Sequence, residues 1–223
     1  MNTFLKVKIN LKSVNSNMSP KKKVLMVCLG NSCRSPIAEA VFYDEIKKLN
    51  LSDVWEVDSV ALLQYHVGNG PEPRAMSTLK KRGITDYTHI ARQITKEDFY
   101  KFDWIFGMDS GIVIDLCQMQ PEDSQAKIEL LGKYDPNGEL NIRDPLFDSD
   151  SAGFEKAFEQ AARSIKVFLE RHKGSFIYHD ISFIKSLRII YFYIILSRNN
   201  FLYRYYKYII TPIIIALLYI PYI

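Results

Sequence analysis

Stretches with the length of β-strands alternate with stretches of helical periodicity through the middle of this 223-residue chain. The apolar runs predict strands at 24–29, 55–62, 89–94, 104–108 and 128–131, and helices are expected at 36–49, 74–82, 112–119 and 154–172. Strands separated by helices pair in parallel, because a parallel connection needs a crossover of about that length. We therefore predict the α/β class, a doubly wound, mostly four-stranded parallel sheet with helices on both faces.

Charge divides the chain into three parts. Residues 1–20 carry three Lys and no acidic residue, and residues 175–223 carry five Lys or Arg and one Asp. The middle part, 21–174, has 21 basic and 24 acidic side chains, so the overall charge of +4 comes from the two ends. A basic face for nucleic acid is therefore not expected on the domain at 21–174, and we predict no nucleic-acid partner.

The two ends are interpreted separately from this domain. Residues 1–20 have neither the apolar core of a secretory signal nor an Arg, so they are read as an N-terminal extension, either disordered or an artefact of start-site choice. Residues 175–223 form an apolar tail that holds nine of the 14 Tyr. Its apolar runs, 189–196 and 209–223, fall short of the roughly 20 residues of a membrane span. A membrane anchor, a further helical layer and translated non-coding sequence all stay open, and membrane contact is expected only if the tail is genuine.

The connection between the first strand and the first helix carries the strongest chemical signal. It reads Cys28-Leu29-Gly30-Asn31-Ser32-Cys33-Arg34-Ser35. Its backbone N–H groups and the helix N-terminus form an anion cradle, although no Lys closes it as in a nucleotide-binding P-loop. A cysteine within a ring of N–H donors is activated as a thiolate. Arg34 offers a planar fork for two oxygens of a phosphate group. This arrangement predicts a phosphate monoester site with a cysteine nucleophile.

The same segment, VLMVCLGNSCRSPIAEAVF, resembles the active-site segment of the low-molecular-weight protein tyrosine phosphatases, also called cytosolic acid phosphatases. Further similar motifs follow in order: VDS at 57–59, HVGN at 66–69, PRAMSTLKKRGI, HIARQITKEDF, AKIELLGKYDP and RDP at 143–145. The resemblance covers about residues 22–173. It implies the phosphotyrosine phosphatase I-like fold and a metal-independent phosphatase without a cofactor, acting on phosphotyrosine in proteins and on small aryl phosphates.

The resemblance also implies roles for individual residues. Cys28 would attack phosphorus, Arg34 and the loop amides would hold the phosphate oxygens, and Asp144 would act as general acid and then general base. The substrate-binding residues it implies are Leu29, Gly30, Asn31, Ser32, Cys33, Ser35, Tyr65, Leu146 and Phe147. Asn31 and Ser35 would brace the loop, and Cys33 would form a reversible disulfide with Cys28. His89 would pair with Asp109, and Cys117 is expected in the core.

Two positions depart from the family pattern and bear on specificity. Ser32 stands where eukaryotic members usually carry an apolar residue and where related bacterial phosphoarginine phosphatases carry Thr. Leu146 and Phe147 replace two aromatic residues, commonly Tyr-Tyr, that follow Asp-Pro. Because an aromatic wall adds about 0.5–1.5 kcal/mol to ring binding, Leu146 predicts weaker aryl selectivity, with Tyr65 as the remaining wall.

Several alternatives stay open beside the phosphotyrosine phosphatase. Ser32 leaves a phosphoarginine phosphatase possible, and a non-enzymatic phosphate-binding module would need none of Cys28, Arg34 and Asp144. An arsenate reductase would need more well-placed cysteines than Cys117 alone supplies. The four His residues lack metal-ligand spacing, so no metal site is expected. Three cysteines do not make a disulfide framework, and a cytoplasmic location is predicted.

Overall fold

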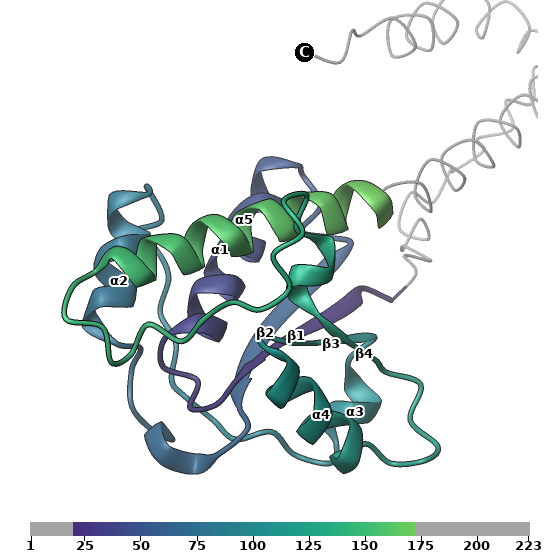
Figure 1. The fold of residues 1–223 in the computed structure, drawn as a ribbon. Coiled ribbons are helices and arrows are strands. Elements are labelled where there is room, and N and C mark those ends of the chain that lie inside the picture. The colour runs from purple at the N-terminus through teal and green to yellow at the C-terminus, as the bar shows by residue number, and fades with distance from the viewer. Residues whose placement is uncertain (1–19, 173–223) are drawn as a thin grey trace, which may run out of the picture. The chain divides into compact units, whose positions relative to one another are not determined.

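The computed structural model describes residues 20–172 of the chain (Figure 1). The predictions for the N-terminal extension, apart from Pro20, and for the tail at 175–223 lie outside the described residues. Among the helices of residues 20–172, none combines the length and the apolar character that a membrane crossing requires.

A four-stranded parallel sheet forms the centre of the described region. Its strands are β1 (Lys22–Cys28), β2 (Trp55–Ala61), β3 (Trp104–Gly107) and β4 (Lys127–Leu130), in the order β2-β1-β3-β4. β1 therefore lies between β2 and β3, and successive crossovers run to opposite sides of it. This makes the carboxyl end of β1 the point where the strand order reverses, which is where ligands bind in open α/β sheets.

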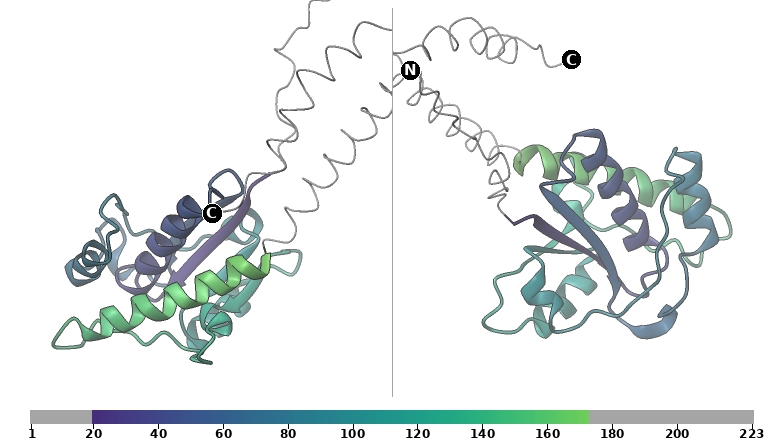
Figure 2. Two further views of the ribbon diagram at one scale, coloured as in Figure 1. Left: turned by 90° about the horizontal axis from the view of Figure 1, so that it is seen from above. Right: turned by 180° about the vertical axis from the view of Figure 1, so that it is seen from behind.

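Helices cover both faces of the sheet, as predicted (Figures 1 and 2). α1 (Arg34–Lys48) and α5 (Ala152–His172) lie over one face, and α2 (Pro73–Lys81) packs beside α1. α3 (Asp98–Lys101) and α4 (Ser110–Met119) lie over the other face. Two short 3₁₀ turns, η2 (Gln64–His66) and η3 (Leu131–Tyr134), complete the elements.

Alternation along the strands supplies a separate core to each face. Leu25 and Val27 of β1 join Phe99 and Leu116 in a buried cluster on the side of α3 and α4. On the other side an aromatic cluster centres on Phe168 of α5, in edge or tilted contact with Phe42, Trp55, Trp104, Phe106 and Tyr134. Burying each such ring contributes roughly 1.5–3 kcal/mol, so both layers clamp β1 and fix its carboxyl end.

Two of the local predictions are wrong. The segment 89–94 forms no strand, because only Gln93 makes a β-bridge, to Ala61 at the end of β2. Cys117 is exposed and not part of the core. It follows Leu116, which faces the sheet, and one further step along a helix turns a side chain about 100° away.

Candidate active site

The loop between β1 and α1 turns its carbonyls outward. Leu62 N–H donates to the carbonyl of Cys28 at 2.9 Å, and Leu63 N–H donates to that of Leu29 at 2.9 Å. Glu72 N–H donates to the carbonyl of Ser32 at 2.9 Å. A peptide whose carbonyl is held on the outside presents its N–H on the inside, so these three contacts shape the loop into a cradle.

The N–H groups of the same loop are left for a ligand. Within residues 20–172, the backbone N–H groups of residues 29–33 have no protein acceptor. α1 begins at Arg34 without a side-chain cap, so its first N–H groups also face the loop. Since N–H groups that converge at a helix N-terminus bind anions, the loop is built to hold a group such as phosphate.

Cys28 and the bracing residues lie at the centre of the cradle. The Ser35 hydroxyl donates to Cys28 Sγ at 3.1 Å. Asn31 takes a left-handed conformation, with φ of 53°, and its side-chain amide donates to Ser35 at 3.0 Å and Ser59 at 2.9 Å. These hydrogen bonds connect Asn31 and Ser35 to each other, to Cys28 and to Ser59 of β2.

Arg34 joins three segments of the chain. Its Nη1 donates to Asp109 at 2.5 Å and to the carbonyl of Ile142 at 3.2 Å, and its Nη2 donates to Asp144 at 2.7 Å. Its Nε is buried without a hydrogen-bond partner among the described residues. An unpaired guanidinium N–H beside the loop is available to an oxygen of a bound phosphate.

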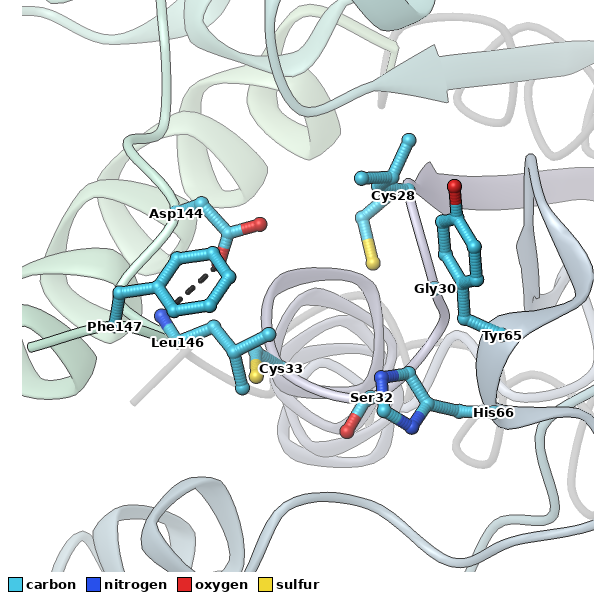
Figure 3. Close-up of a pocket in the computed structure, with 10 residues that line it drawn as sticks. Cys28, Gly30, Ser32, Cys33, Tyr65, His66, Asp144, Leu146 and Phe147 are labelled. Carbon is cyan, nitrogen blue, oxygen red and sulfur yellow. Dashed lines mark hydrogen bonds between the residues drawn. The ribbon is translucent and has the colours of Figure 1, made fainter.

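Asp144 lies across the pocket from Tyr65, on the segment that also carries Leu146 and Phe147. Its second carboxylate oxygen accepts the N–H of Leu146 at 3.1 Å, which closes a tight turn around Pro145 (Figure 3). The carboxylate is thereby fixed from both ends, by Arg34 and by its own loop. It lines the same pocket as Cys28.

One pocket brings together most of the predicted site residues (Figure 3). Tyr65 and His66 lie on one side of it, and Leu146 and Phe147 lie on the other, with the Cys28 thiol between them. The remaining lining residues are Leu29, Gly30, Ser32, Cys33 and Asp144. Asn31, Arg34 and Ser35 are buried behind this lining. The walls are mostly apolar, which suits an aromatic ring attached to the phosphate.

His66 was missed by the sequence analysis. Its ring lies so close to Gly30 that a β-carbon at Gly30 would lie 2.7 Å from Cδ2 of His66. A glycine in the loop is therefore required by this ring. Only the position of His66 next to Tyr65 could have indicated that it lines the pocket.

The predicted pair of His89 and Asp109 is wrong. His89 Nδ1 lies 3.2 Å from a carboxylate oxygen of Glu39, and its Nε2 lies 2.7 Å from the side-chain oxygen of Asn31. His89 lies on the β2 side of β1, whereas Asp109 follows β3 on the other side. Asp109 instead caps α4, accepting Ile112 N–H at 3.0 Å, and holds Arg34. Glu39 was also missed, although it is the one charged residue in the otherwise apolar stretch 36–42.

Burial sets the protonation of the groups behind the loop. It raises the pKa of Glu39 to about 7, although hydrogen bonds from Ser59 and Tyr87 act in the opposite direction. Burial lowers the pKa of His89 and raises that of Tyr87, the latter with help from the charge of Glu39. Each of these pKa shifts acts in favour of the neutral form of its group.

Glu39, Asp58 and His89 also bring three potential metal ligands within 4.8 Å of one another. Sequence spacing did not reveal this group, because its members come from α1, β2 and a loop. Arg92 donates to Asp58 at 2.7 Å and to Asp98 at 2.9 Å, which places a positive charge against the cluster. The three residues serve the hydrogen-bond network of the loop in this structure.

Cys33 is a buried thiol at the start of α1. Burial, followed by the charge of Cys28, raises the pKa of Cys33 to about 12. The Cys33 thiol therefore stays protonated at neutral pH, unlike an attacking nucleophile.

Known proteins resemble this chain in both sequence and structure. The sequence model described as low molecular weight phosphotyrosine protein phosphatase matches residues 23–175. A low molecular weight phosphotyrosine protein phosphatase of Rattus norvegicus is 51% identical over 152 residues, 67% of this chain and 95% of the relative. The crystal structure of Primo-1 is similar with a TM-score of 0.65 and 45% identity, covering 68% of this chain and 98% of that one. That of DARP, the drosophila arginine phosphatase, has a TM-score of 0.64 and 40% identity, with coverage of 68% and 98%.

Proposed function

The chain belongs to the low molecular weight phosphotyrosine protein phosphatase family, and on that premise we propose that Cys28, Arg34 and Asp144 carry out its reaction, the hydrolysis of phosphotyrosine in proteins. The observation that supports this assignment best is the loop around Cys28. Its carbonyls are bonded outward to Leu62, Leu63 and Glu72, and its N–H groups remain for phosphate oxygens.

In the first step the Cys28 thiolate attacks phosphorus, and the bond between phosphorus and the tyrosine oxygen breaks. Asp144 gives its proton to that departing oxygen, so tyrosine leaves as a neutral phenol. Arg34 and the loop N–H groups hold the remaining phosphate oxygens as charge builds on them. The product is a phosphocysteine at Cys28.

In the second step Asp144, now a carboxylate, takes a proton from water while the water oxygen attacks phosphorus. The bond between phosphorus and sulfur breaks, and inorganic phosphate leaves. Cys28 returns as a thiolate, which the Ser35 hydroxyl stabilises. Proton transfer of this kind is typically worth about 10²–10⁴ in rate.

The pocket walls support an aryl phosphate as substrate. Tyr65, Leu146 and Phe147 surround the mouth with apolar surface, and Asp144 is the only acidic residue among the lining residues. Small aryl phosphates should therefore be hydrolysed as well as phosphotyrosine. We also propose a cytoplasmic location, a reducing compartment in which the three cysteines of the chain would stay reduced.

Phosphoarginine is a second candidate substrate. Ser32 places a hydroxyl in the pocket lining, and the similar structure of DARP is that of an arginine phosphatase. Against it, a guanidinium in this pocket would meet the apolar side chains of Leu146 and Phe147 and one carboxylate, that of Asp144, which is already paired with Arg34. We therefore rank phosphotyrosine first.

Turnover of p-nitrophenyl phosphate in the presence of EDTA tests the proposal. Wild type should be active, Cys28→Ser should lose all measurable turnover, and Ser77→Ala, a change on the exposed face of α2, should match wild type. Phosphotyrosine peptides should then be hydrolysed faster than phosphoarginine peptides of the same sequence. The reverse order would establish the second candidate, and phosphate binding by a folded but inactive wild type would leave only a binding module.

A further inference from the structure

A row of exposed apolar side chains extends from one wall of the pocket. Leu63, Tyr65, Val67 and Ile90 are 40%, 69%, 47% and 64% exposed, and we call them the apolar rim. Tyr65 belongs both to this rim and to the pocket lining. A contiguous exposed apolar surface next to a binding pocket is typical of an interaction site.

Backbone hydrogen bonds attach the apolar rim to the catalytic loop. Leu63 N–H donates to the carbonyl of Leu29 at 2.9 Å. Gly68 N–H donates to the carbonyl of Ala91 at 2.8 Å, and Ala91 N–H donates to the carbonyl of Asn69 at 2.9 Å. The last two bonds place Ile90 next to the segment of Val67. The rim residues therefore lie on neighbouring segments, and Leu63 is joined by its backbone to the loop that follows Cys28.

The rim carries no charge of its own. The sequence from Ser59 to Pro71 contains no Lys, Arg, Asp or Glu. Glu72 and Arg92, which border the rim, are engaged in ion pairs, Glu72 with Arg74 and Arg92 with Asp58 and Asp98. A charged residue of a substrate would thus lose hydration here without finding a free partner, whereas an apolar residue would bury its surface.

We propose that the apolar rim binds the residues that flank the phosphorylated tyrosine, and that the enzyme consequently selects phosphotyrosine sites with large apolar neighbours. The inference rests on the proposed function. A tyrosine in the pocket passes between Tyr65 and Phe147, and we assign the peptide attached to it to the Tyr65 side, over the other rim residues. Because an extended chain spans about 3.3–3.6 Å per residue, neighbours up to about three positions away reach the rim.

Peptide turnover tests this surface. Matched phosphotyrosine peptides would carry Leu and Val, Ser, or Asp at the three positions on each side, and kcat/KM would be compared for wild type and a Leu63→Ser, Val67→Ser, Ile90→Ser variant. We expect wild type to prefer the apolar peptide about tenfold over the Ser peptide, as burial of one or two side chains predicts. The triple variant should lose this preference when its peptide kcat/KM is divided by its own kcat/KM for p-nitrophenyl phosphate, which corrects for any effect of Leu63 on the loop.

The control is Ile114→Ser, which removes an apolar side chain of α4 that is 57% exposed and lies outside the rim. Ile114→Ser should keep the full preference for the apolar peptide. If the triple rim variant does not fold, the three single substitutions are measured in its place. An equal preference in wild type and rim variants, or none in wild type, would overturn the inference. Self-association of wild type that the rim substitutions abolish, with peptide preference unchanged, would assign the rim to a second copy instead. If wild type did not hydrolyse p-nitrophenyl phosphate at all, the proposed function would be contradicted, and not only the role of the rim.

Discussion

The Nη2 atom of Arg34 lies 2.7 Å from a carboxylate oxygen of Asp144, a residue 110 positions later in the chain. The pair joins the residue assigned to the phosphate oxygens with the residue assigned to the leaving group. Asp109 holds the other side of the guanidinium at 2.5 Å. The proposed clamp and the proposed acid are thus positioned by one shared set of ion pairs at the carboxyl ends of β1 and β3.

Replacing Ser35 by Ala removes the hydroxyl that donates to Cys28 Sγ. A hydrogen bond to a charged group is worth about 1.5–3 kcal/mol, so we expect kcat/KM for p-nitrophenyl phosphate to fall about 10- to 100-fold. Alkylation of Cys28 by iodoacetamide at mildly acidic pH should slow in parallel. Unchanged alkylation with reduced turnover would show that Ser35 acts on the loop and not on the thiolate.

Replacing Leu146 by Tyr restores an aromatic wall opposite Tyr65. Ring contact should lower KM for aryl phosphates about 2- to 10-fold, as an aromatic pair adds about 0.5–1.5 kcal/mol. An alkyl phosphate, measured beside p-nitrophenyl phosphate, should gain nothing. An equal gain for both substrates would exclude ring contact as the cause.

Replacing Glu39 by Gln should change how stability depends on pH. The folded protein raises the pKa of Glu39 from 4.5 to about 7, so between these values it holds a proton that the unfolded chain releases. The free energy of unfolding therefore loses a contribution of Glu39, on the order of 1–3 kcal/mol, as pH rises from about 4.5 to about 7. Glu39→Gln should lack this loss.

Urea unfolding across this pH range measures the difference between the two proteins. The lowered pKa of His89 acts in the opposite sense, because it reduces stability as pH falls below 6.5. His89 is present in both proteins, so the difference between their pH profiles reports on Glu39 together with its contact to His89. Parallel profiles would mean that Glu39 ionises as readily in the folded protein as in the unfolded chain.

Cys33 should protect Cys28 from irreversible oxidation. Peroxide converts the Cys28 thiolate to a sulfenic acid, which then condenses with Cys33 to a disulfide, and the Cys33 proton leaves with the sulfenic oxygen as water. Wild type inactivated by peroxide should recover with dithiothreitol, whereas Cys33→Ser should progress to sulfinic acid and recover little. Cys117→Ser, which changes the exposed third cysteine, is the matched control. Equal recovery of all three proteins would remove this role from Cys33.

The sequence alone predicted the parallel sheet and the loop at the end of β1, because strand length, helical periodicity and the run from Cys28 to Ser35 are local signals. It did not predict the contacts between segments. Asp109 was assigned to His89, although the strand order puts these residues on opposite sides of β1. The half-buried position of Glu39 depends on how α1 packs against β2, and the position of His66 depends on the short turn η2. No local sequence pattern predicts either position.

Trapping the covalent intermediate tests the central assignment most directly. Asp144→Asn would be mixed with excess p-nitrophenyl phosphate, quenched in acid within the first turnovers, digested and analysed by mass spectrometry. The p-nitrophenolate group leaves readily without a proton, whereas attack by water on the phosphocysteine lacks its general base. The intermediate should therefore accumulate. We predict the mass of one phosphoryl group on Cys28, in the peptide that also contains Arg34. Release of p-nitrophenol with Cys28 unmodified, or with the phosphoryl group on another residue, would contradict the mechanism.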